Sequence, residues 1–143
     1  MRNTRDRIRH AVLFELIALV IVTPLGGMIF DVPQNHFGVI VVASTTVAMV
    51  WNYGYNLAFD HAMLGLLKDV RKTLPVRMVH ATLFEAGLLC LLVPLISWYL
   101  AVTLWGAFIM DVSLAGFYMV YAFAFNWIYD AVFPVKATGL SDS

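Results

Sequence analysis

Four long apolar segments, separated by short polar stretches, dominate the hydrophobic pattern of this chain. They cover roughly residues 10–30, 37–59, 78–99 and 102–129. About 20 mostly apolar residues span the hydrocarbon core of a bilayer as a helix, so each segment is long enough to cross a membrane. The pattern therefore predicts an all-α integral membrane protein with four transmembrane helices.

The composition indicates the same class. Of the 143 residues, 62% are hydrophobic and 13% are charged, whereas charged residues make up about 25% of an ordinary soluble domain. The first apolar segment is long, contains Glu15 and is not followed by a small-residue cleavage site. We therefore expect it to remain as a helix rather than to act as a cleaved secretory signal.

Basic residues gather on one side of the predicted membrane. They precede the first segment, separate the second from the third and follow the fourth, whereas the two remaining turns contain no Lys or Arg. Because basic residues near the ends of spans remain in the cytoplasm, both termini and the middle loop are predicted to be cytoplasmic. The basic residues are Arg2, Arg5, Arg7, Arg9, Lys68, Arg71, Lys72, Arg77 and Lys136.

The chain also repeats itself. RIRHAVLFE at 7–15 returns as RMVHATLFE at 77–85, and WNYGYNLAFD at 51–60 returns in weaker form as YAFAFNWIYD at 121–130. This is an internal duplication of a helical hairpin. Since both hairpins start on the same side of the membrane, the repeats are parallel rather than inverted. We predict a first hairpin at 1–68, a second at 69–134 and a polar cytoplasmic tail at 135–143.

Three acidic residues fall inside the apolar segments. Glu15 lies about 12 Å along its helix from Arg7, in the cytoplasmic half of the bilayer, and Glu85 has the same depth. Asp111 lies near the middle of the bilayer, where the first repeat has Val41. A charged side chain there costs roughly 2.5–3.5 kcal/mol, so such residues are expected to be functional. We predict that all three bind protons or a cationic substrate.

Polar and aromatic residues recur at the cytoplasmic ends of the second and fourth segments. In the second segment they follow a helical spacing, with amides on one face and aromatic rings beside them. Ring faces attract cations, although an interfacial aromatic belt is the alternative interpretation. All these motifs lie at cytoplasmic helix ends, so we expect them to converge in one layer of a small bundle. The expected substrate contacts are Trp51, Asn52, Tyr55, Asn56 and Asn126.

Charged residues at the helix ends are expected to have a structural role. Acidic residues near helix C-termini and arginines near N-termini each lie at the unfavourable end of the helix dipole, which favours ion pairs between helices. The histidines of the repeated motif either join that network or relay protons. The set consists of Arg7, His10, Asp60, Arg77, His80 and Asp130.

The sequence lacks the signatures of an enzyme. It has no nucleophile and base at a usable spacing and no Gly-rich phosphate loop. The seven methionines are scattered and have no Cys or His at ligand spacing. We expect no cofactor, no metal site and no nucleic-acid partner. The single Cys90 excludes an intramolecular disulfide.

RxxHAxxFE, found twice, together with WNxxYNxxFD and FNWxYD, resembles the bacterial transmembrane pair arrangement of the proteobacterial antimicrobial compound efflux (PACE) family. The resemblance covers residues 7–130. It implies an inner-membrane exporter of chlorhexidine-like biguanides, cationic dyes and quaternary ammonium compounds, with short-chain diamines as natural substrates. It also implies proton coupling at Glu15. The fourth motif departs from the family pattern, because Tyr121 and Ala122 replace the Trp and the polar residue of the second motif.

Together these patterns predict a proton-coupled antiporter of cationic drugs, embedded in the bacterial inner membrane as a multi-pass protein. A homodimer is expected, because four helices alone enclose little volume. Two alternatives remain open. A non-transporting sensor or assembly protein would use the buried Glu structurally, and a small-ion channel would conduct downhill without exchange.

Overall fold

The computed structural model describes residues 3–68 and 73–134, and these form four α-helices. All four helices are long and apolar enough to span a membrane, which confirms the predicted fold class. The predicted tail at 135–143 and four of the basic residues, Arg2, Arg71, Lys72 and Lys136, lie outside the described residues. The helices are α1 Thr4–Phe30, α2 Gln34–Leu67, α3 Leu74–Leu100 and α4 Leu104–Val132.

The helices extend beyond the apolar segments at the ends farthest from the α1–α2 and α3–α4 turns. α1 begins at Thr4, well before the apolar pattern starts, and α2 continues to Leu67. Asn3 accepts a hydrogen bond from the Asp6 backbone N–H at 2.8 Å and so caps α1. An apolar segment predicts only the part of a helix that lies in lipid. The polar helical turns beyond it were therefore not included in the predicted segments.

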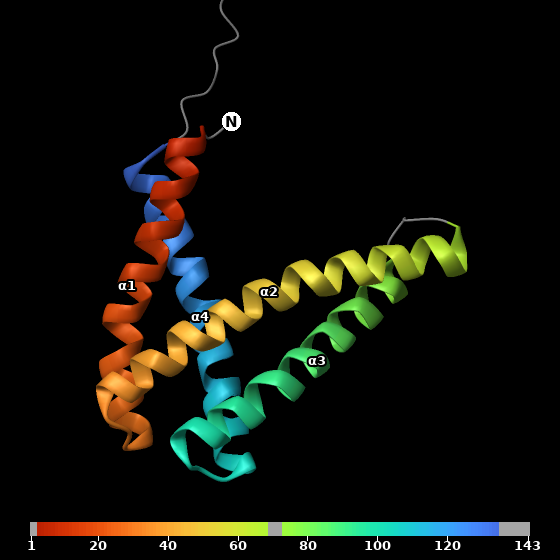
Figure 1. Ribbon diagram of the computed structural model, residues 1–143. Coiled ribbons are helices and arrows are strands. Elements are labelled where there is room, and N and C mark those ends of the chain that lie inside the picture. The colour runs from red at the N-terminus through yellow and green to blue at the C-terminus, as the bar shows by residue number, and fades with distance from the viewer. Residues whose placement is uncertain (1–2, 69–72, 135–143) are drawn as a thin grey trace, which may run out of the picture.

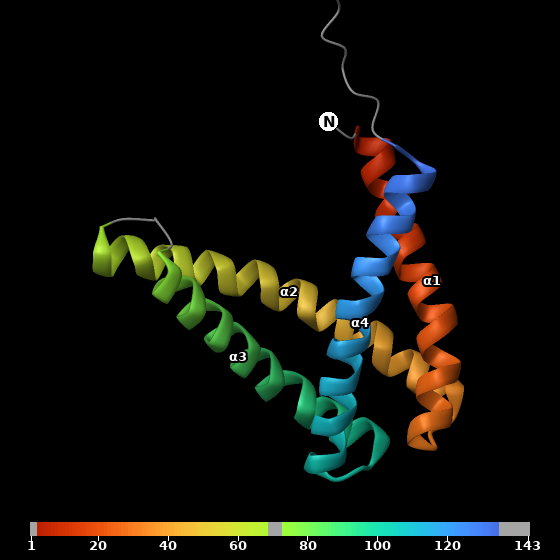
Figure 2. The ribbon, with the colours of Figure 1, turned by 180° about the vertical axis from the view of Figure 1, so that it is seen from behind.

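The four helices form a V-shaped molecule with two arms (Figures 1 and 2). α1 and α4 lie side by side in one arm, and α2 and α3 lie side by side in the other. The arms meet where the α1–α2 and α3–α4 turns lie and diverge toward the opposite end. The basic residues that the structure describes lie at the divergent end, and by the positive-inside rule we expect the wide side of the V to face the cytoplasm.

The two turns at the closed end have the same geometry. α1 and α3 each end in a residue with left-handed backbone, Asp31 at φ 53° and Ala101 at φ 52°. The backbone N–H of Asp31 donates to the Gly27 carbonyl, and that of Ala101 donates to the Ser97 carbonyl. These residues occupy matching positions in the two repeats. The duplicated sequence therefore folds into a duplicated hairpin, with the left-handed residue satisfying a carbonyl of the last helical turn.

The buried core lies at the closed end of the V. It consists of two apolar clusters built from the helix halves nearest the turns, and it holds the two arms together there. In the helix halves farther from these turns, the hydrogen bonds between helices run within each arm instead. One cluster contains Ile40, Leu92, Ile96, Ala107 and Met110. The other contains Val22, Phe37, Val41 and Leu114.

The two repeats fill this core with opposite distributions of large and small side chains. Gly26 of α1 faces Phe37 of α2, and a Cβ atom at Gly26 would lie 1.9 Å from the Phe37 ring. The second repeat has Ile96 and Ala107 at the matching positions, and both are completely buried. The large residue is therefore on the second helix of the first hairpin but on the first helix of the second hairpin. In both hairpins a large side chain on one helix packs against a small residue on the other, so the interior remains filled.

Changing Gly26→Ile is expected to destabilise the protein, because the new side chain overlaps the Phe37 ring. Overpacking of this kind costs about 1–3 kcal/mol. The double change Gly26→Ile with Phe37→Ala recreates the arrangement of the second repeat and is expected to recover most of the loss. The measurement is the thermal unfolding midpoint of the purified protein in detergent. A double variant no more stable than Gly26→Ile alone contradicts the complementary packing.

Candidate functional site

A cavity of about 410 Å³ lies where the two arms diverge, and all four helices line it. Its apolar lining includes Phe14, Val41, Leu88, Leu92 and Leu114. Its polar lining consists of Glu15, Ser44, Thr45, Asn52, Glu85, Asp111 and Tyr118.

The structure brings the three predicted membrane carboxylates to this one cavity. Asp111 is the most enclosed, with 9% of its surface exposed, whereas Glu15 is half-buried and Glu85 is exposed. Glu85 lies near enough to act electrostatically on Asp111, and Glu15 acts in the same way on Tyr118. Three helices thus contribute negative charge to a single space between the arms, which attracts cations and disfavours anions.

The predicted substrate contacts divide into three groups. Asn52 lines the central cavity with the carboxylates. Trp51 and Tyr55 instead line a separate apolar cavity of about 480 Å³, formed by α2 and α3. Asn56 and Asn126 are hydrogen-bonded to histidines. The expected convergence in one layer is therefore not observed, because the second and fourth motifs lie in different arms.

Each arm contains the same His–Asn pair. His10 Nε2 lies 2.7 Å from Asn126 Oδ1 and joins α1 to α4. His80 Nε2 lies 3.1 Å from Asn56 Oδ1 and joins α3 to α2. The first helix of each hairpin is thus bonded to the second helix of the other hairpin. Both roles expected of these histidines, structural bonding and proton relay, remain predictions.

The residues before the two glutamates are held in equivalent ways. The Tyr121 hydroxyl donates to the Phe14 carbonyl at 2.8 Å, and the Trp51 indole N–H donates to the Phe84 carbonyl at 3.1 Å. Trp51 and Tyr121 occupy matching repeat positions, so the substitution in the fourth motif preserves the donor. These bonds fix the helical turn that carries Glu15 or Glu85.

A polar cluster at the open end of the α1–α4 arm, where α1 begins and α4 ends, was not predicted from the sequence. Arg9 forms an ion pair with Asp6, and its Nε–H donates to the Tyr129 hydroxyl at 3.0 Å. The Arg9 guanidinium also lies 3.9 Å from the centre of the Phe133 ring. The sequence signal was the Asp–Arg pair three residues apart on one helix. The ion pairs expected among Arg7, Asp60, Arg77 and Asp130 remain a prediction.

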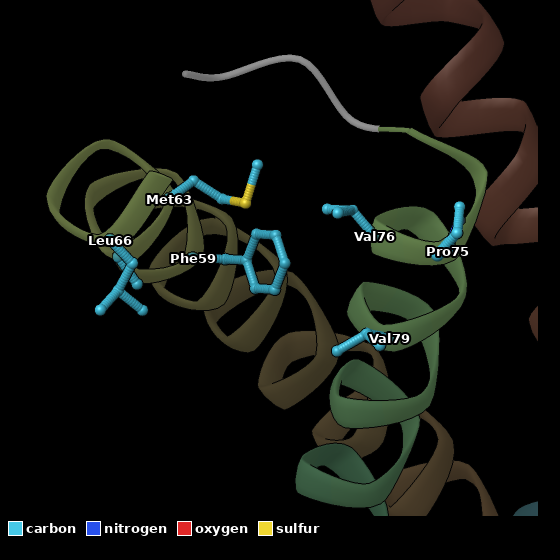
Figure 3. Close-up of a pocket in the computed structure, with 7 residues that line it drawn as sticks. Phe59, Met63, Leu66, Pro75, Val76 and Val79 are labelled. Carbon is cyan, nitrogen blue, oxygen red and sulfur yellow. The ribbon is translucent and has the colours of Figure 1, made fainter. Parts of the chain in front are cut away.

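The matching end of the α2–α3 arm is apolar. A cavity of about 320 Å³ lies there, and Figure 3 shows Phe59 and Met63 of α2 on one side and Val76 and Val79 of α3 on the other. These four residues occupy the repeat positions of the polar cluster. The cavity carries no charged side chain in its lining and is a poor candidate for binding a cation. No group of three His, Cys, Asp or Glu side chains able to hold a metal ion occurs within residues 3–68 and 73–134.

Four membrane-length helices, arranged as two parallel repeats around a carboxylate-lined cavity, are typical of a small multi-pass membrane transport protein. The comparison with protein families agrees: the family described as chlorhexidine efflux transporter matches residues 2–65 and again residues 72–135. The chain therefore belongs to this family, whose members are the bacterial transmembrane pair proteins of the PACE group. The double match also confirms the internal repeat.

Characterised relatives cover nearly the whole chain. A short-chain diamines transporter of Vibrio parahaemolyticus is 36% identical over 129 residues, which is 90% of this chain and 91% of the relative. A short-chain diamines transporter of Acinetobacter baumannii is 35% identical over 132 residues, which is 92% of this chain and 90% of that protein. One from Acinetobacter baylyi is 30% identical over 92% of both chains. No solved structure matches the chain.

Removing one cross-helix hydroxyl from either arm is expected to lower stability by about 0.5–1.5 kcal/mol. Tyr121→Phe removes the bond to the Phe14 carbonyl, and Tyr55→Phe removes a bond of 2.8 Å to the His80 carbonyl. Because the two sites lie in separate arms, the losses in the double variant should add to within about 0.5 kcal/mol. Tyr53→Phe is the control, since Tyr53 is 75% exposed. Denaturation of the purified protein in detergent measures all four.

Proposed function

We propose that this protein exports organic cations across the bacterial inner membrane in exchange for protons. The observation that carries the proposal is the meeting of Glu15, Glu85 and Asp111, from three helices, in one cavity between the arms. A carboxylate in that position binds either a cation or a proton, and the two compete for it. Such competition is sufficient to couple export of a cation to entry of protons. In this proposal the substrate crosses the membrane without chemical conversion.

The names of the family and of its relatives support a cationic substrate. The family description names chlorhexidine, and the relatives are named for short-chain diamines. Both kinds of molecule carry two basic nitrogen groups separated by an alkyl chain. We propose the same class for this chain, extended to cationic dyes and quaternary ammonium compounds that share the positive charge.

The V shape supports an alternating-access cycle. In the proposed cycle a cation enters from the cytoplasm or inner leaflet at the wide side of the V and reaches Glu15. Each arm has its own hydrogen bonds, so the arms can approach as units about the core at the closed end. Closing the cytoplasmic side and loosening the core would then expose the carboxylates to periplasmic protons, which displace the cation.

We propose that the chain functions as a homodimer with both termini in the cytoplasm. Glu85 is exposed on the surface of one protomer, although it lies within a membrane span. A second copy or bound substrate would shield this carboxylate from lipid, where an isolated charge is unfavourable.

Glu15→Gln is expected to reduce substrate-driven proton release at least about tenfold, because the amide cannot exchange a proton for a cation. The measurement is proton flux in liposomes that contain the purified protein under an imposed pH gradient, after addition of chlorhexidine or 1,5-diaminopentane. Asp31→Asn is the matched control, since Asp31 lies in an exposed turn outside the cavity and Asn is tolerated in its left-handed conformation.

Equal proton release by Glu15→Gln and the unchanged protein contradicts the role of Glu15. Absence of substrate-driven proton movement in the unchanged protein contradicts exchange altogether and favours a sensor or assembly protein. Conduction of small ions without a substrate requirement favours the channel.

The orientation is tested by labelling single cysteines in a Cys90→Ala background. Gln34→Cys lies next to the α1–α2 turn and Leu74→Cys lies at the start of α3, and both positions are exposed. A membrane-impermeant maleimide added to intact spheroplasts is expected to label position 34 but not position 74. The opposite pattern places the termini in the periplasm.

A further inference from the structure

The cavity between the arms is covered unequally on its two sides. Glu15 of α1 and Glu85 of α3 occupy matching repeat positions and line the same cavity. Glu15 is nevertheless half-buried, whereas Glu85 is exposed. The helical turns that carry the two residues are held by equivalent hydrogen bonds. The difference in exposure therefore arises from the side chains around each carboxylate.

Tyr118 of α4 covers the side of the cavity next to Glu15. The centre of its ring lies 6.2 Å from that of Phe14, the residue before Glu15, and the ring packs against the core cluster that contains Phe37. The Tyr118 hydroxyl reaches across to the other arm, where it forms a hydrogen bond with the Thr45 side chain of α2. The hydroxyl oxygen has no surface accessible to solvent. This side of the cavity is thus closed by a bridge between the arms.

The side next to Glu85 has a different pair of residues at the bridge positions. In the repeat alignment Tyr118 matches Ala48 of α2, and Thr45 matches Ala115 of α4. Both alanines line the cavity. An alanine side chain ends at Cβ and is too short to reach the opposite arm. The alanine pair therefore leaves open the side that corresponds to the one closed by the bridge.

The open side lies at the depth of the lipid acyl chains. Glu85 is about 16 Å along α3 from Leu74, within a helix that is long and apolar enough to span a membrane. In the proposed orientation this depth belongs to the inner leaflet. A cation with an apolar body partitions into that leaflet, and the negative charge of an exposed carboxylate raises its concentration at the edge of the cavity.

We propose that the opening formed by Glu85, Ala48 and Ala115 is the entrance through which amphiphilic cations pass from the inner leaflet into the cavity. Tyr118 and Thr45 close the equivalent opening on the α1 side. This inference rests on the proposed function and names the route to its site.

The two duplicated glutamates then have different tasks. Glu85 attracts the cation at the entrance, and Glu15 holds it inside the cavity. The cover that Tyr118 provides keeps lipid away from the charge of Glu15, which is unfavourable in an apolar surrounding. At the entrance, passing substrate rather than a second copy of the chain shields Glu85.

The test builds the bridge of the closed side on the open side. Ala48→Tyr combined with Ala115→Thr recreates the Tyr–Thr pair beside Glu85. Chlorhexidine binding to the full-length protein in lipid nanodiscs is followed by stopped-flow tryptophan fluorescence. This double variant is expected to slow association and dissociation at least about tenfold each and to change Kd less than about twofold, because an entrance alters the barrier and not the bound state. The retained Kd also shows that the variant is folded.

The reverse experiment opens the side next to Glu15. Tyr118→Ala and Thr45→Ala, added to the Ala48→Tyr and Ala115→Thr variant, are expected to return the association rate to within about threefold of that of the unchanged protein. A rate that stays slow contradicts the assignment of Tyr118 as the closure. Val42→Tyr is the matched control for an added tyrosine on α2, since Val42 is 51% exposed and does not line the cavity. It is expected to leave both rate constants unchanged.

A ligand without an apolar body distinguishes entry from the leaflet from entry through the wide side of the V. 1,5-Diaminopentane stays in water and approaches the carboxylates from the wide side. Its association with the Ala48→Tyr and Ala115→Thr variant is therefore expected to stay within about threefold of that with the unchanged protein. Equal slowing of chlorhexidine and the diamine contradicts an entrance from the leaflet.

The inference fails if the Ala48→Tyr and Ala115→Thr variant binds chlorhexidine at the unchanged rate, or if Kd rises while the association rate stays the same. It also fails if this variant has a different mass in detergent by light scattering, because the face at Glu85 is then a contact between two copies. Each of these results leaves the proposed function intact when chlorhexidine still drives proton release that depends on Glu15. An unchanged protein that neither binds chlorhexidine nor releases protons removes the proposed function as well.

Discussion

The apolar core at the closed end of the V is the constraint on which the remaining structure depends. Lipid tails are as apolar as leucine, so helices in a membrane are held together by close packing and polar bonds rather than by expulsion of water. Here the close packing is concentrated around residues such as Phe37 and Ile96 near the turns. The other halves of the helices are left as two pairs, and the carboxylates line the cavity between these pairs.

Polar bonds within each arm complete this arrangement. The repeated donors at Trp51 and Tyr121 bond to the carbonyls that precede the two glutamates, so each Glu side chain starts from a fixed turn of helix. The scaffold is close to symmetric, but its cavity is not, because Asp111 and Tyr118 occur in the second repeat alone. The duplicated hairpins form the framework of the protein. Residues on one face of α4 that differ from their counterparts in α2 make the two sides of the cavity chemically different.

Much of this organisation could be predicted from the sequence. The apolar segments and the 7–15 and 77–85 repeats predicted the helices and the parallel hairpins. The acidic residues within spans identified Glu15, Glu85 and Asp111 as candidate site residues, but their meeting in one cavity was not predicted. The divergence of the arms could not be predicted, because a periodic pattern specifies which face is apolar and not the angle between helices. The unpaired hydroxyl of Ser44 could not be predicted either, since an ordinary serine in a helix normally bonds to its own backbone.

The exchange of partners between hairpins has a consequence for biosynthesis. His80 and Asn56 are separated by 24 residues, so the α2–α3 arm can assemble once α3 is complete at Leu100, before α4 is made. His10 and Asn126 are separated by 116 residues, so α1, which packs against α2 near the turn, gains its hydrogen bond to α4 only when the last helix has been made. During that interval Glu15 lacks the cover that α4 gives it in the folded protein. The α1–α4 arm is therefore the last part of the fold that can form.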